Sequence, residues 1–485
     1  MKPIISKISD ISLTQSLVCI TGNKDIPGWL KLGKSESDYV KSQLDRGEES
    51  VFINNYERCV YFVNLPEGKE HYKIREEVRR SAYKLRRLIK SNNHNELVIA
   101  SEGAYKGAIE DFTEGFILSI YSFRKYRADK PGKSGKPKNQ YPEKLLLYAD
   151  IADDIIGRLT ETLNAVYFTR DLINEPVNHL NAVGLAGEIK KLGDAAGFSV
   201  EILNKGKIES LKMGGLLAVN KGSIDPPSFS ILEWKPAKHV NTNPIVLVGK
   251  GIVYDTGGLN LKPGESMAGM KGDMAGAAII SGTVYVAAKT GIPLHVIGLV
   301  PSTDNRPGGN AYAQGDVITM YNKMTVEVAN TDAEGRLILA DALSYASKYE
   351  PELIIDVATL TGSAAMTFSS HAIAMMSNAS KKYIDLLKES GNETYERVAE
   401  LPLWDEYAEG LKSDIADMKN IGNGREAGAI IAGKFLEKFT DYPLIHLDIA
   451  GMELLKKDEY YRLKNGTASG LRLLAHFLRK LAELY

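Results

Sequence analysis

The sequence predicts an α/β fold, with a small N-terminal α/β domain and a larger C-terminal α/β/α domain around a central mixed, largely parallel sheet. Two observations carry this prediction. Apolar runs of strand length alternate with helix-length segments along the chain, which is typical of strands that are buried on both faces and joined by crossover helices. The chain also has 485 residues, 44% of them hydrophobic, and this exceeds what a single ordinary core needs.

The first domain is expected over residues 1–150. Its strand-like runs are SLVCITG, CVYFVNL and ELVIAS, and a helix-like stretch, REEVRRSAYKLRRLIK, precedes the last of them. Lys, Gly and Pro cluster in residues 127–144, where apolar residues nearly vanish, so this stretch is expected to be a basic linker or loop. Few candidate catalytic or metal-binding residues lie in this domain, and we expect it to serve assembly or regulation.

The second domain is expected over residues 151–485. Four apolar runs predict its buried strands: NPIVLVG, PLHVIGLV, ELIIDVA and YPLIHLDIA. Three longer segments predict crossover helices: MAGAAIISGTVYVAAK, GRLILADALSYASK and GAIIAGKFLEKF. In sheets of this kind, ligands bind beyond the carboxyl ends of the strands. The residues that directly follow these runs are therefore the first candidates for a functional site.

The composition excludes several classes of protein. Lys and Arg total 60 and Asp and Glu total 61, giving a net charge of −1, so no overall field favours a nucleic acid as partner. Two cysteines, Cys19 and Cys59, are too few for a disulfide framework or a cysteine-ligated zinc site. The N-terminus lacks a signal-peptide core, and no apolar run approaches the roughly 20 residues of a membrane span. We therefore expect a cytoplasmic protein without a membrane partner.

Charged residues follow the predicted strands. Lys250 comes directly after one strand, and Asp255 and Lys262 follow in what we expect to be a loop. Asp273 precedes an Ala-rich helix, a position where an aspartate can also be a plain N-cap.

A second pair of acids, Asp332 and Glu334, follows a predicted strand that ends near Ala329. In extended backbone, residues two apart point to the same side, so both carboxylates would face one site. Gly335 and Arg336 begin the next helix, and the two acids can alternatively be a capping pair that the helix dipole satisfies.

With Asp255 and Asp273, these acids supply four carboxylates, enough for two divalent ions about 3.5–4 Å apart. Zinc, manganese or magnesium accepts such an oxygen-rich site. From charge alone, Lys250 is expected to be a salt-bridge partner, because an ammonium group has no lone pair for a metal.

The string NTDAEGRL, residues 330–337, resembles the signature of the leucine aminopeptidase (cytosol aminopeptidase) family of dinuclear metallopeptidases. Five further segments resemble family segments in the expected order: VGKGIVYDTGG, MKGDM, DVATLTGS, LKSDIADMKNIG and HLDIAG. The resemblance covers about residues 165–478, and it is loose in the N-terminal part, where GFILSIYSFRKYR matches best. It implies that the second domain is a catalytic metallopeptidase domain.

The resemblance implies five metal ligands for two divalent ions, zinc or manganese. One ion is implied to be held by Lys250, as a neutral amine, with Asp255, Asp273 and Glu334; the other is implied to be held by Asp255, Asp332 and Glu334. A lysine beside two dications has a lowered pKa. The resemblance therefore replaces the salt-bridge prediction for Lys250.

The implied activity is that of a leucyl aminopeptidase, a hydrolase that releases leucine and similar apolar residues from short peptides with a free N-terminus. A water or hydroxide that bridges both ions is implied as the nucleophile. Lys262 is implied to stabilise the oxyanion, and Arg336 to hold a bicarbonate that acts as general base. His446, in HLDIAG, is expected to be a packed or hydrogen-bonded core residue.

The resemblance also implies a substrate pocket. The residues implied to surround the substrate side chain are Met270, Thr359, Gly362 and Ala450, and those toward the leaving group are Asn330, Ala333 and Ile421. Ordinary core packing explains a Met or an Ala in such positions equally well.

Two further implications concern partners. The family resemblance implies a homohexamer of two stacked trimers, with its sites facing an interior cavity. The alternative function is a non-catalytic or moonlighting DNA-binding regulator that retains the aminopeptidase fold and touches DNA through basic loops such as residues 127–144. The presence of all five implied ligands together with Lys262 and Arg336 argues against this alternative.

Overall fold

The computed structural model describes residues 2–22, 25–66, 68–127, 141–424 and 426–485. The chain divides into two compact units, of which the first is Met1–Leu163 with Lys457–Leu463 and the second is Asn164–Lys456 with Lys464–Tyr485. The boundary falls within α4 (Asp153–Asn174). The predicted basic linker lies largely outside the described residues, which omit 128–140, and it therefore stays a prediction.

The first unit is built on a six-stranded sheet with the order β1-β6-β5-β2-β4-β3. All neighbouring strands are parallel except β3, which is antiparallel to β4. The strands are β1 (Ile4–Ile8), β2 (Leu17–Thr21), β3 (Ser50–Asn54), β4 (Cys59–Asn64), β5 (Glu96–Glu102) and β6 (Lys144–Tyr148). The runs SLVCITG, CVYFVNL and ELVIAS thus form β2, β4 and β5, as the sequence predicts.

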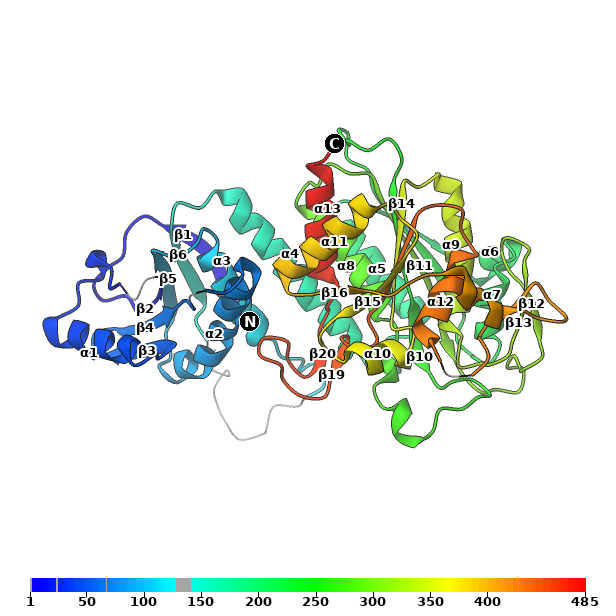
Figure 1. Ribbon diagram of the computed structural model, residues 1–485, viewed down its shortest axis with the longest axis horizontal. Coiled ribbons are helices and arrows are strands. Elements are labelled where there is room, and N and C mark those ends of the chain that lie inside the picture. Colours follow the sequence, from blue (N-terminus) through cyan, green and yellow to red (C-terminus); the bar gives the residue numbers. More distant parts are fainter. Residues whose placement is uncertain (1, 23–24, 67, 128–140, 425) are drawn as a thin grey trace. The chain divides into compact units, whose positions relative to one another are not determined.

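Helices in the described part of this unit accompany the sheet (Figure 1). They are α1 (Lys34–Asp45), α2 (His71–Ser91) and α3 (Ala108–Ser119), and a 3-10 turn, η1 (Gly28–Leu30), precedes the first. Val40 and Leu44 of α1 share a core with Leu17 and Cys19 of β2. The intervening Val18 and Ile20 are also fully buried, so β2 is covered on both faces, as the strands of parallel sheets are.

The second unit contains a nine-stranded mixed sheet with the order β16-β15-β18-β14-β9-β11-β8-β7, to which β10 adds beside β11. Its central strands β18, β14, β9 and β11 are mutually parallel. The strands are β7 (Ser199–Leu203), β8 (Ser228–Trp234), β9 (Ile245–Gly249), β10 (Gly251–Asp255), β11 (Val296–Asn305), β14 (Leu353–Ala358), β15 (Ile373–Ser377), β16 (Val398–Glu400) and β18 (Leu444–Asp448). The predicted mixed, largely parallel sheet is confirmed, and all four predicted runs are among its strands.

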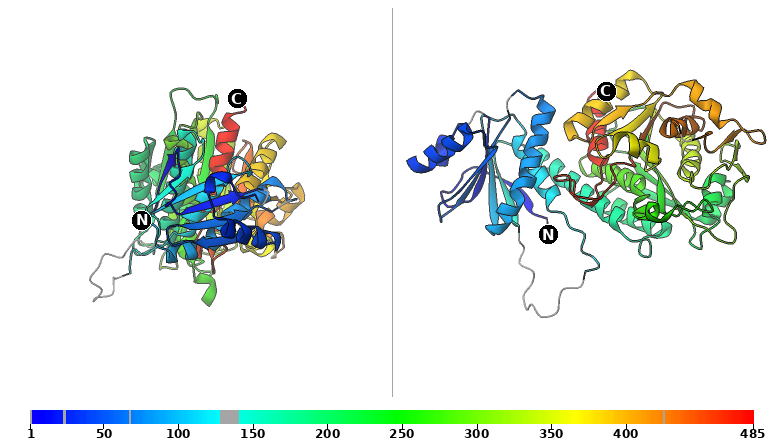
Figure 2. Two further views of the ribbon diagram at one scale, coloured as in Figure 1. Left: turned by 90° about the vertical axis from the view of Figure 1, so that its left-hand side faces the viewer. Right: turned by 60° about the horizontal axis from the view of Figure 1, so that its bottom comes forward.

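Helices cover both faces of this sheet (Figures 1 and 2), with α5, α8 and α13 on one face and α7, α9 and α12 on the other. The helices of the unit are α5 (Ala182–Ala196), α6 (Lys205–Ser210), α7 (Gly214–Asn220), α8 (Ala275–Lys289), α9 (Gly335–Ala346), α10 (Gly362–Phe368), α11 (Lys381–Thr394), α12 (Gly428–Glu437) and α13 (Leu471–Ala482). Val246 and Val248 of β9 pack in the core on the α9 side. The alternate residues Ile245 and Leu247 are equally buried, which explains the unbroken apolar run of this strand.

Short elements complete the second unit. They are the strands β12 (Val317–Thr319), β13 (Thr325–Glu327), β17 (Met418–Lys419), β19 (Leu454–Leu455) and β20 (Asn465–Gly466), and the 3-10 turns η2 (Gly264–Met267), η3 (Met270–Gly272), η4 (Ser347–Tyr349) and η5 (Asp405–Leu411). The strand β17 pairs with β13 in parallel, and β19 pairs with β20 in an antiparallel bridge. The first pairing brings the segment before Ile421 beside the segment before Asn330.

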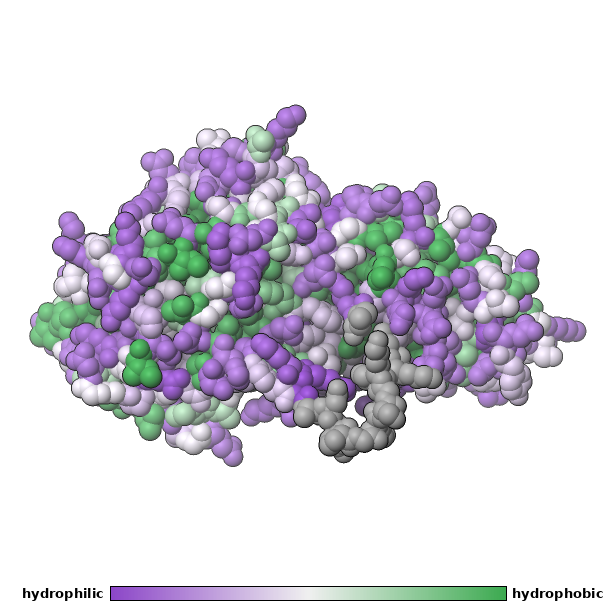
Figure 3. Space-filling view, turned by 180° about the vertical axis from the view of Figure 1, so that it is seen from behind, coloured by the Kyte–Doolittle hydropathy of each residue, from purple (hydrophilic) through white to green (hydrophobic). Residues whose placement is uncertain are grey.

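Among the described residues, no helix has both the length and the apolar character required to cross a bilayer. On the face shown in Figure 3, hydrophobic groups are interspersed with hydrophilic side chains.

Candidate metal centre

The candidate residues meet at the carboxyl ends of the central strands of the second sheet. Lys250 directly follows β9, Asp255 ends β10, and Thr359 directly follows β14. Glu334 immediately precedes α9. The expectation that residues after the strands form the site is therefore met geometrically, because parallel strands end at one edge of a sheet.

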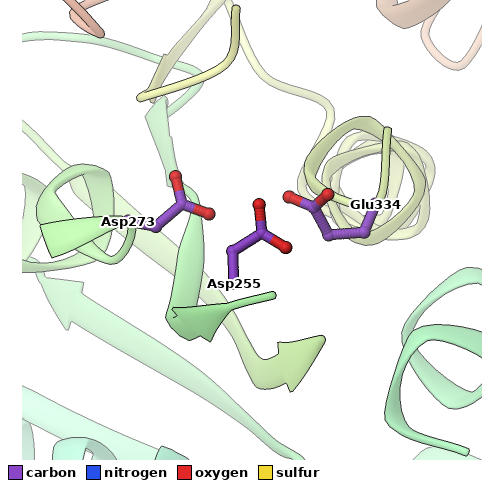
Figure 4. Close-up of side chains that lie close together, drawn as sticks. All are labelled: Asp255, Asp273 and Glu334. Carbon is purple, nitrogen blue, oxygen red and sulfur yellow. The ribbon is translucent and has the colours of Figure 1, made fainter. Parts of the chain in front are cut away.

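Three carboxylates point toward one another in this region (Figure 4): Asp255, Asp273 and Glu334. One oxygen from each lies within 4.8 Å of the others, and all three residues are buried. Carboxylate oxygens at such separations suit a shared divalent cation.

Two lysines lie among the acids. The Lys250 Nζ is 2.9 Å from Asp273 Oδ1 and 3.0 Å from Glu334 Oε1. The Lys262 Nζ is 2.8 Å from Asp255 Oδ2 and 2.5 Å from Asp332 Oδ1. The structure thus brings together all five residues predicted as metal ligands, with Lys262 beside them.

The charges of this cluster do not balance, since four carboxylates face two ammonium groups. Burial, followed by repulsion from Glu334, raises the pKa of Asp255 to about 6. Burial is also the main reason that the pKa of Asp273 rises to about 8. Burial thus favours the neutral form of these two carboxyl groups, and a cation placed between them would favour the ionised form.

The pKa values of the two lysines and of Glu334 shift in the direction that favours their charged forms. Burial lowers the pKa of Lys250, but Asp273, Glu334 and Asp255 outweigh burial and raise it above its ordinary value. Burial likewise raises the pKa of Glu334, but the two lysines outweigh it and lower that pKa. Lys250 is therefore an ammonium in this arrangement, and the neutral amine implied by the family resemblance requires additional positive charge beside it.

The structure contradicts the helix-cap alternative for Asp273, whereas Glu334 does stand at the N-terminus of α9. The N-cap of α8 is Met274, and no side chain caps this helix; Asp273 Oδ1 instead accepts hydrogen bonds from Lys250 Nζ and Thr359 Oγ1. Glu334 stands at the N-cap of α9 without a side-chain cap bond. Both carboxylates lie within 3.0 Å of Lys250 Nζ.

Two local predictions about backbone conformation are also wrong. Asp255 ends a buried strand, β10, rather than lying in a loop. Residues 331–332 form a turn rather than extended backbone, because the Asn330 Oδ1 accepts a hydrogen bond from the Asp332 backbone N–H at 2.8 Å. Asp332 and Glu334 still reach the same site, since the turn delivers one acid to Lys262 and the other to Lys250.

Thr331 joins the two acidic loops. Its Oγ1 donates to the Gly257 carbonyl at 2.7 Å and accepts from the Asn260 backbone N–H at 2.8 Å. The Tyr312 hydroxyl donates to the Thr331 carbonyl at 2.6 Å. These bonds fix the segment that carries Asp332 against the segment between Asp255 and Lys262.

Asn305, at the end of β11, is a site residue that the sequence analysis missed. Its Nδ2 donates to Asp255 Oδ1 at 2.9 Å and to the Thr331 carbonyl at 3.0 Å, and it lies 3.5 Å from Glu334 Oε2. The residue is fully buried. Asn305 is the last residue of a strand whose carboxyl end lies at the site. This position at a strand end is the signal in the sequence that could have identified it.

Asn420 was also missed. Its Oδ1 accepts hydrogen bonds from the backbone N–H groups of Ala329 and Asn330, and its Nδ2 donates to the Asn330 carbonyl. The Asn420 carbonyl accepts a 2.8 Å hydrogen bond from Arg336 Nη1. A single buried amide therefore connects the start of α9 with the loop before Ile421.

Arg336 is buried at the start of α9, and its Nε has no hydrogen-bond partner among the described residues. Burial lowers its pKa to about 10, while Glu334 and Asp448 oppose this shift. An uncompensated guanidinium nitrogen beside a cation site suits a small anion.

His446 fits the expected core role. It is fully buried, and its Nδ1 lies 2.6 Å from Asp356 Oδ1 on the neighbouring strand. Burial lowers the pKa of His446, but Asp356 outweighs burial and raises it.

The residues predicted to bind substrate lie in the loops around this cluster. Thr359 is buried and bonded to Asp273, whereas Gly362 is exposed. The remaining predicted pocket residues are partly buried: Met270, Asn330, Ala333, Ile421 and Ala450. None of these placements tests a contact with substrate, so the pocket stays a prediction.

The residues present fit divalent cations. Asp273 Oδ2 is buried and has no hydrogen-bond partner within the described part of the chain, and such a buried acceptor is costly to leave unsatisfied. The donor set is rich in carboxylates, which hard or borderline divalent ions accept. The fold and the site thus define an α/β protein with a carboxylate-rich cation centre at the carboxyl edge of its sheet.

Comparisons with known proteins identify the family. The sequence pattern of the cytosol aminopeptidase family, catalytic domain, matches residues 167–475. A probable cytosol aminopeptidase of Chloroherpeton thalassium is 44% identical over 387 residues, which cover 76% of this chain and 74% of that protein. A relative with the same description from Geotalea uraniireducens is 42% identical over 375 residues, or 76% and 74% of the two chains. The chain therefore belongs to the cytosol aminopeptidase family.

A solved structure agrees with this assignment. The bottromycin maturation enzyme BotP in complex with Mn superposes with a TM-score of 0.84 at 26% identity, covering 97% of this chain and 100% of that chain. The family is one of divalent-metal-dependent aminopeptidases, so the chain is a metal-dependent hydrolase of peptides. The matched family gives no support to the DNA-binding alternative.

Proposed function

We propose that this protein is a cytoplasmic leucyl aminopeptidase that removes leucine and similar apolar residues from short peptides with a free N-terminus, with the help of two divalent ions, zinc or manganese. The observation that carries the proposal is the cluster of four carboxylates, three of them buried and Asp332 partly accessible to solvent, around only two lysines. Membership of the cytosol aminopeptidase family supports the same reaction.

The proposed ligands divide into two overlapping sets. Lys250, Asp255, Asp273 and Glu334 would hold one ion, and Asp255, Asp332 and Glu334 would hold the other. The free Asp273 Oδ2 supports the first set. When bound, two such ions supply Lewis acidity toward a water molecule and a peptide carbonyl.

Lys262 is suited to stabilise negative charge on the substrate. Its side chain keeps partial access to solvent, at 15% exposure, so it can face a bound peptide. Burial lowers its pKa, but Asp255 and Glu334 outweigh burial and keep it raised. A permanently charged ammonium at the edge of the site can therefore stabilise an oxyanion as it develops.

Arg336 is suited to hold a bicarbonate through its Nε, which has no partner among the described residues, and such an anion would supply a base at the site. Arg336 Nη1 is already fixed on the Asn420 carbonyl, which orients the guanidinium. The lack of a histidine among the ligand residues supports a need for such a base.

Substrate binding is proposed for the loops around the cluster. Met270, Thr359, Gly362 and Ala450 would surround the N-terminal side chain, and Asn330, Ala333 and Ile421 would lie toward the leaving group. The partial burial of most of these residues supports access from solvent. Assembly as a homohexamer is proposed from family membership alone, and light scattering of the purified protein tests it.

The function is tested by hydrolysis of leucinamide. We expect activity to disappear after treatment with a chelator and to return with Zn²⁺ or Mn²⁺, and Lys262→Ala to lower kcat about 100- to 1,000-fold without metal loss. Lys238→Ala, at an exposed position, is the matched control and should keep full activity. Undiminished hydrolysis by metal-stripped protein would contradict the proposal.

A further inference from the structure

Glu453 carries a buried carboxylate that the proposed reaction does not use. Its Oε2 is buried and has no hydrogen-bond partner among the described residues. The residue lies two positions after the HLDIAG segment, behind Met452, and directly precedes β19. The carboxyl group has backbone N–H partners at Glu453 and Leu454, but a buried oxygen without a partner is unfavourable, and Oε2 therefore has room for a donor from outside the chain.

The neighbours of Glu453 place it beside the proposed substrate pocket. The next residue, Leu454, packs so closely on the η3 turn that a Cβ on Gly269 would lie 2.6 Å from Leu454 Cδ2, and one on Gly272 would lie 3.6 Å from its Cδ1. This turn contains Met270 and ends at Asp273. Glu453 thus lies in the chain between Ala450 and Leu454, the residue that packs on the η3 turn, and its carboxyl group is close enough to Asp273 and Asp448 to be influenced by their charges.

The backbone around Glu453 is held firmly. Its carbonyl accepts a 3.0 Å hydrogen bond from the Thr467 backbone N–H, and the Met452 carbonyl accepts one from Thr467 Oγ1 at 2.6 Å. Met452 is fully buried. These bonds fix the backbone from which the partly buried Glu453 side chain projects.

The electrostatic surroundings of Glu453 are negative. Burial raises its pKa well above the ordinary value, and Asp273 and Asp448 raise it further. Asp448 accepts hydrogen bonds from Thr361 Oγ1 and from the backbone N–H of Leu360, and as a carboxylate it offers Glu453 no donor. A positive group that entered from the substrate side would relieve all these contributions at once.

We propose that Glu453 selects substrates with a basic N-terminal residue, lysine or arginine, whose charged end pairs with the Glu453 carboxylate in the side-chain pocket. This inference rests on the proposed aminopeptidase function and changes its substrate class: basic N-terminal residues would be preferred, and leucine and similar apolar residues would be released more slowly. The aliphatic stem of a lysine packs against apolar walls while its ammonium reaches a carboxylate. Leucine fills the same walls but leaves Glu453 unpaired.

The decisive comparison is between lysine and norleucine, because their side chains have similar length and differ chiefly in the ammonium group. The wild-type protein, loaded with metal, should hydrolyse lysyl p-nitroanilide with a kcat/KM about 10- to 100-fold above that for norleucyl p-nitroanilide. Glu453→Gln should remove most of this preference by lowering the lysyl value and changing the norleucyl value less than about threefold.

Two further variants test whether the lysyl preference depends on the carboxylate of Glu453. Glu453→Met supplies an apolar side chain, and it should raise the norleucyl value while the lysyl value falls. Glu209→Gln makes the same chemical change as Glu453→Gln at an exposed position of α6, and it should leave both values unchanged. Binding of free lysine and free norleucine, measured by calorimetry, should follow the same ratios without turnover.

Each outcome bears on a different claim. A wild-type protein that hydrolyses norleucyl substrates at least as well as lysyl ones, with a ratio that neither Glu453 variant changes, overturns the proposal but leaves the aminopeptidase function intact. Glutaminyl substrates have a polar side chain without a charge. If Glu453→Gln lowers kcat/KM by the same factor for glutaminyl and lysyl substrates, the effect does not depend on the ammonium charge, and the proposal is overturned. Wild-type protein inactive on every N-terminal residue overturns the proposed function itself.

Discussion

Two buried groups of charges, one in each unit, differ in how well their charges match. In the first unit, Arg79 of α2 pairs with Asp111 at 2.5 Å and Glu114 at 2.6 Å of α3, and Arg75 also pairs with Asp111. Burial lowers the pKa of Arg79, but the two acids outweigh burial and raise it. In the second unit, four carboxylates share two lysines, and the pKa values of Asp255 and Asp273 rise.

The difference separates a structural cluster from a binding one. Matched charges on facing helices satisfy one another and hold α2 against α3. An excess of carboxylates at the end of a sheet destabilises the protein by itself and becomes favourable when a cation enters. Burial alone therefore does not mark a functional site, whereas buried charge without compensation does.

The largest expected effect concerns Asp273. Asp273→Ala removes the carboxylate with a free oxygen and should lower kcat/KM for leucinamide about 1,000-fold or more. Metal analysis should show less than two ions per chain. Asp385→Ala, which breaks only an exposed pair with Lys381, is the control. Full metal content with full activity in Asp273→Ala would remove Asp273 from the ligand set.

A substitution of Arg79 tests the structural role of the charge cluster in the first unit. Arg79→Met leaves Asp111 and Glu114 buried without their main partner, and it should lower the free energy of unfolding by about 3–5 kcal/mol in urea titrations. Arg158→Met, which breaks an i,i+4 pair with exposed Asp154, should cost about 0.5 kcal/mol or less. Folded Arg79→Met should keep the wild-type kcat. A large fall in kcat with unchanged stability would reverse the roles assigned to the two clusters.

Asn305 tests how the carboxylates are held. Asn305→Ala removes the Nδ2 donor to Asp255 and should weaken Mn²⁺ or Zn²⁺ binding about 10- to 100-fold in calorimetric titrations, because residues that orient metal ligands tune affinity to this extent. Asn310→Ala, at an exposed position, serves as its control. Wild-type affinity in Asn305→Ala would mean that the strand end alone orients Asp255.

The smallest expected effect concerns Asp341 of α9, a buried carboxylate that accepts hydrogen bonds from the backbone N–H groups of Leu216 and Tyr321. Burial raises its pKa from 3.8 to about 7. The folded state then holds a proton that the unfolded state releases, so the free energy of unfolding should fall as pH rises from about 4 to 7.

The test of Asp341 uses the difference between wild type and Asp341→Asn in excess chelator, where the other acids titrate alike in both proteins. Between pH 6 and 7, this difference should change by about 1 kcal/mol. A difference that is constant with pH would show that Asp341 is ionised in the folded protein throughout.

Much of the fold follows from the apolar runs. The runs that form β9, β14 and β18 are buried on both faces, so their hydrophobic character is continuous and visible in the sequence. The strand β10, in contrast, contains Gly251 and ends in Asp255, and its sequence was interpreted as loop. The strand β10 is stabilised by pairing with β11. This pairing joins segments that are distant in the sequence, so no local sequence pattern predicts it.

The site was predictable in its principal residues and less so in its geometry. Lys250, Asp273 and Glu334 were found because each follows a predicted strand or precedes a predicted helix. The turn at Asp332 was missed because a side-chain bond from Asn330 overrides extended backbone. Asn420 and Glu453 escaped for a different reason, since their roles depend on contacts or on burial that arise only when remote segments pack together.

The start of α9 sets a limit on transplanting this chemistry. A Cβ on Gly335 would overlap the Lys250 side chain, with Nζ only 2.7 Å away. The lysine therefore reaches the acids through a gap that a methyl group would close. A designer who grafts the six charged side chains onto another scaffold must also copy this bare helix end, or the amine will have no route to its place.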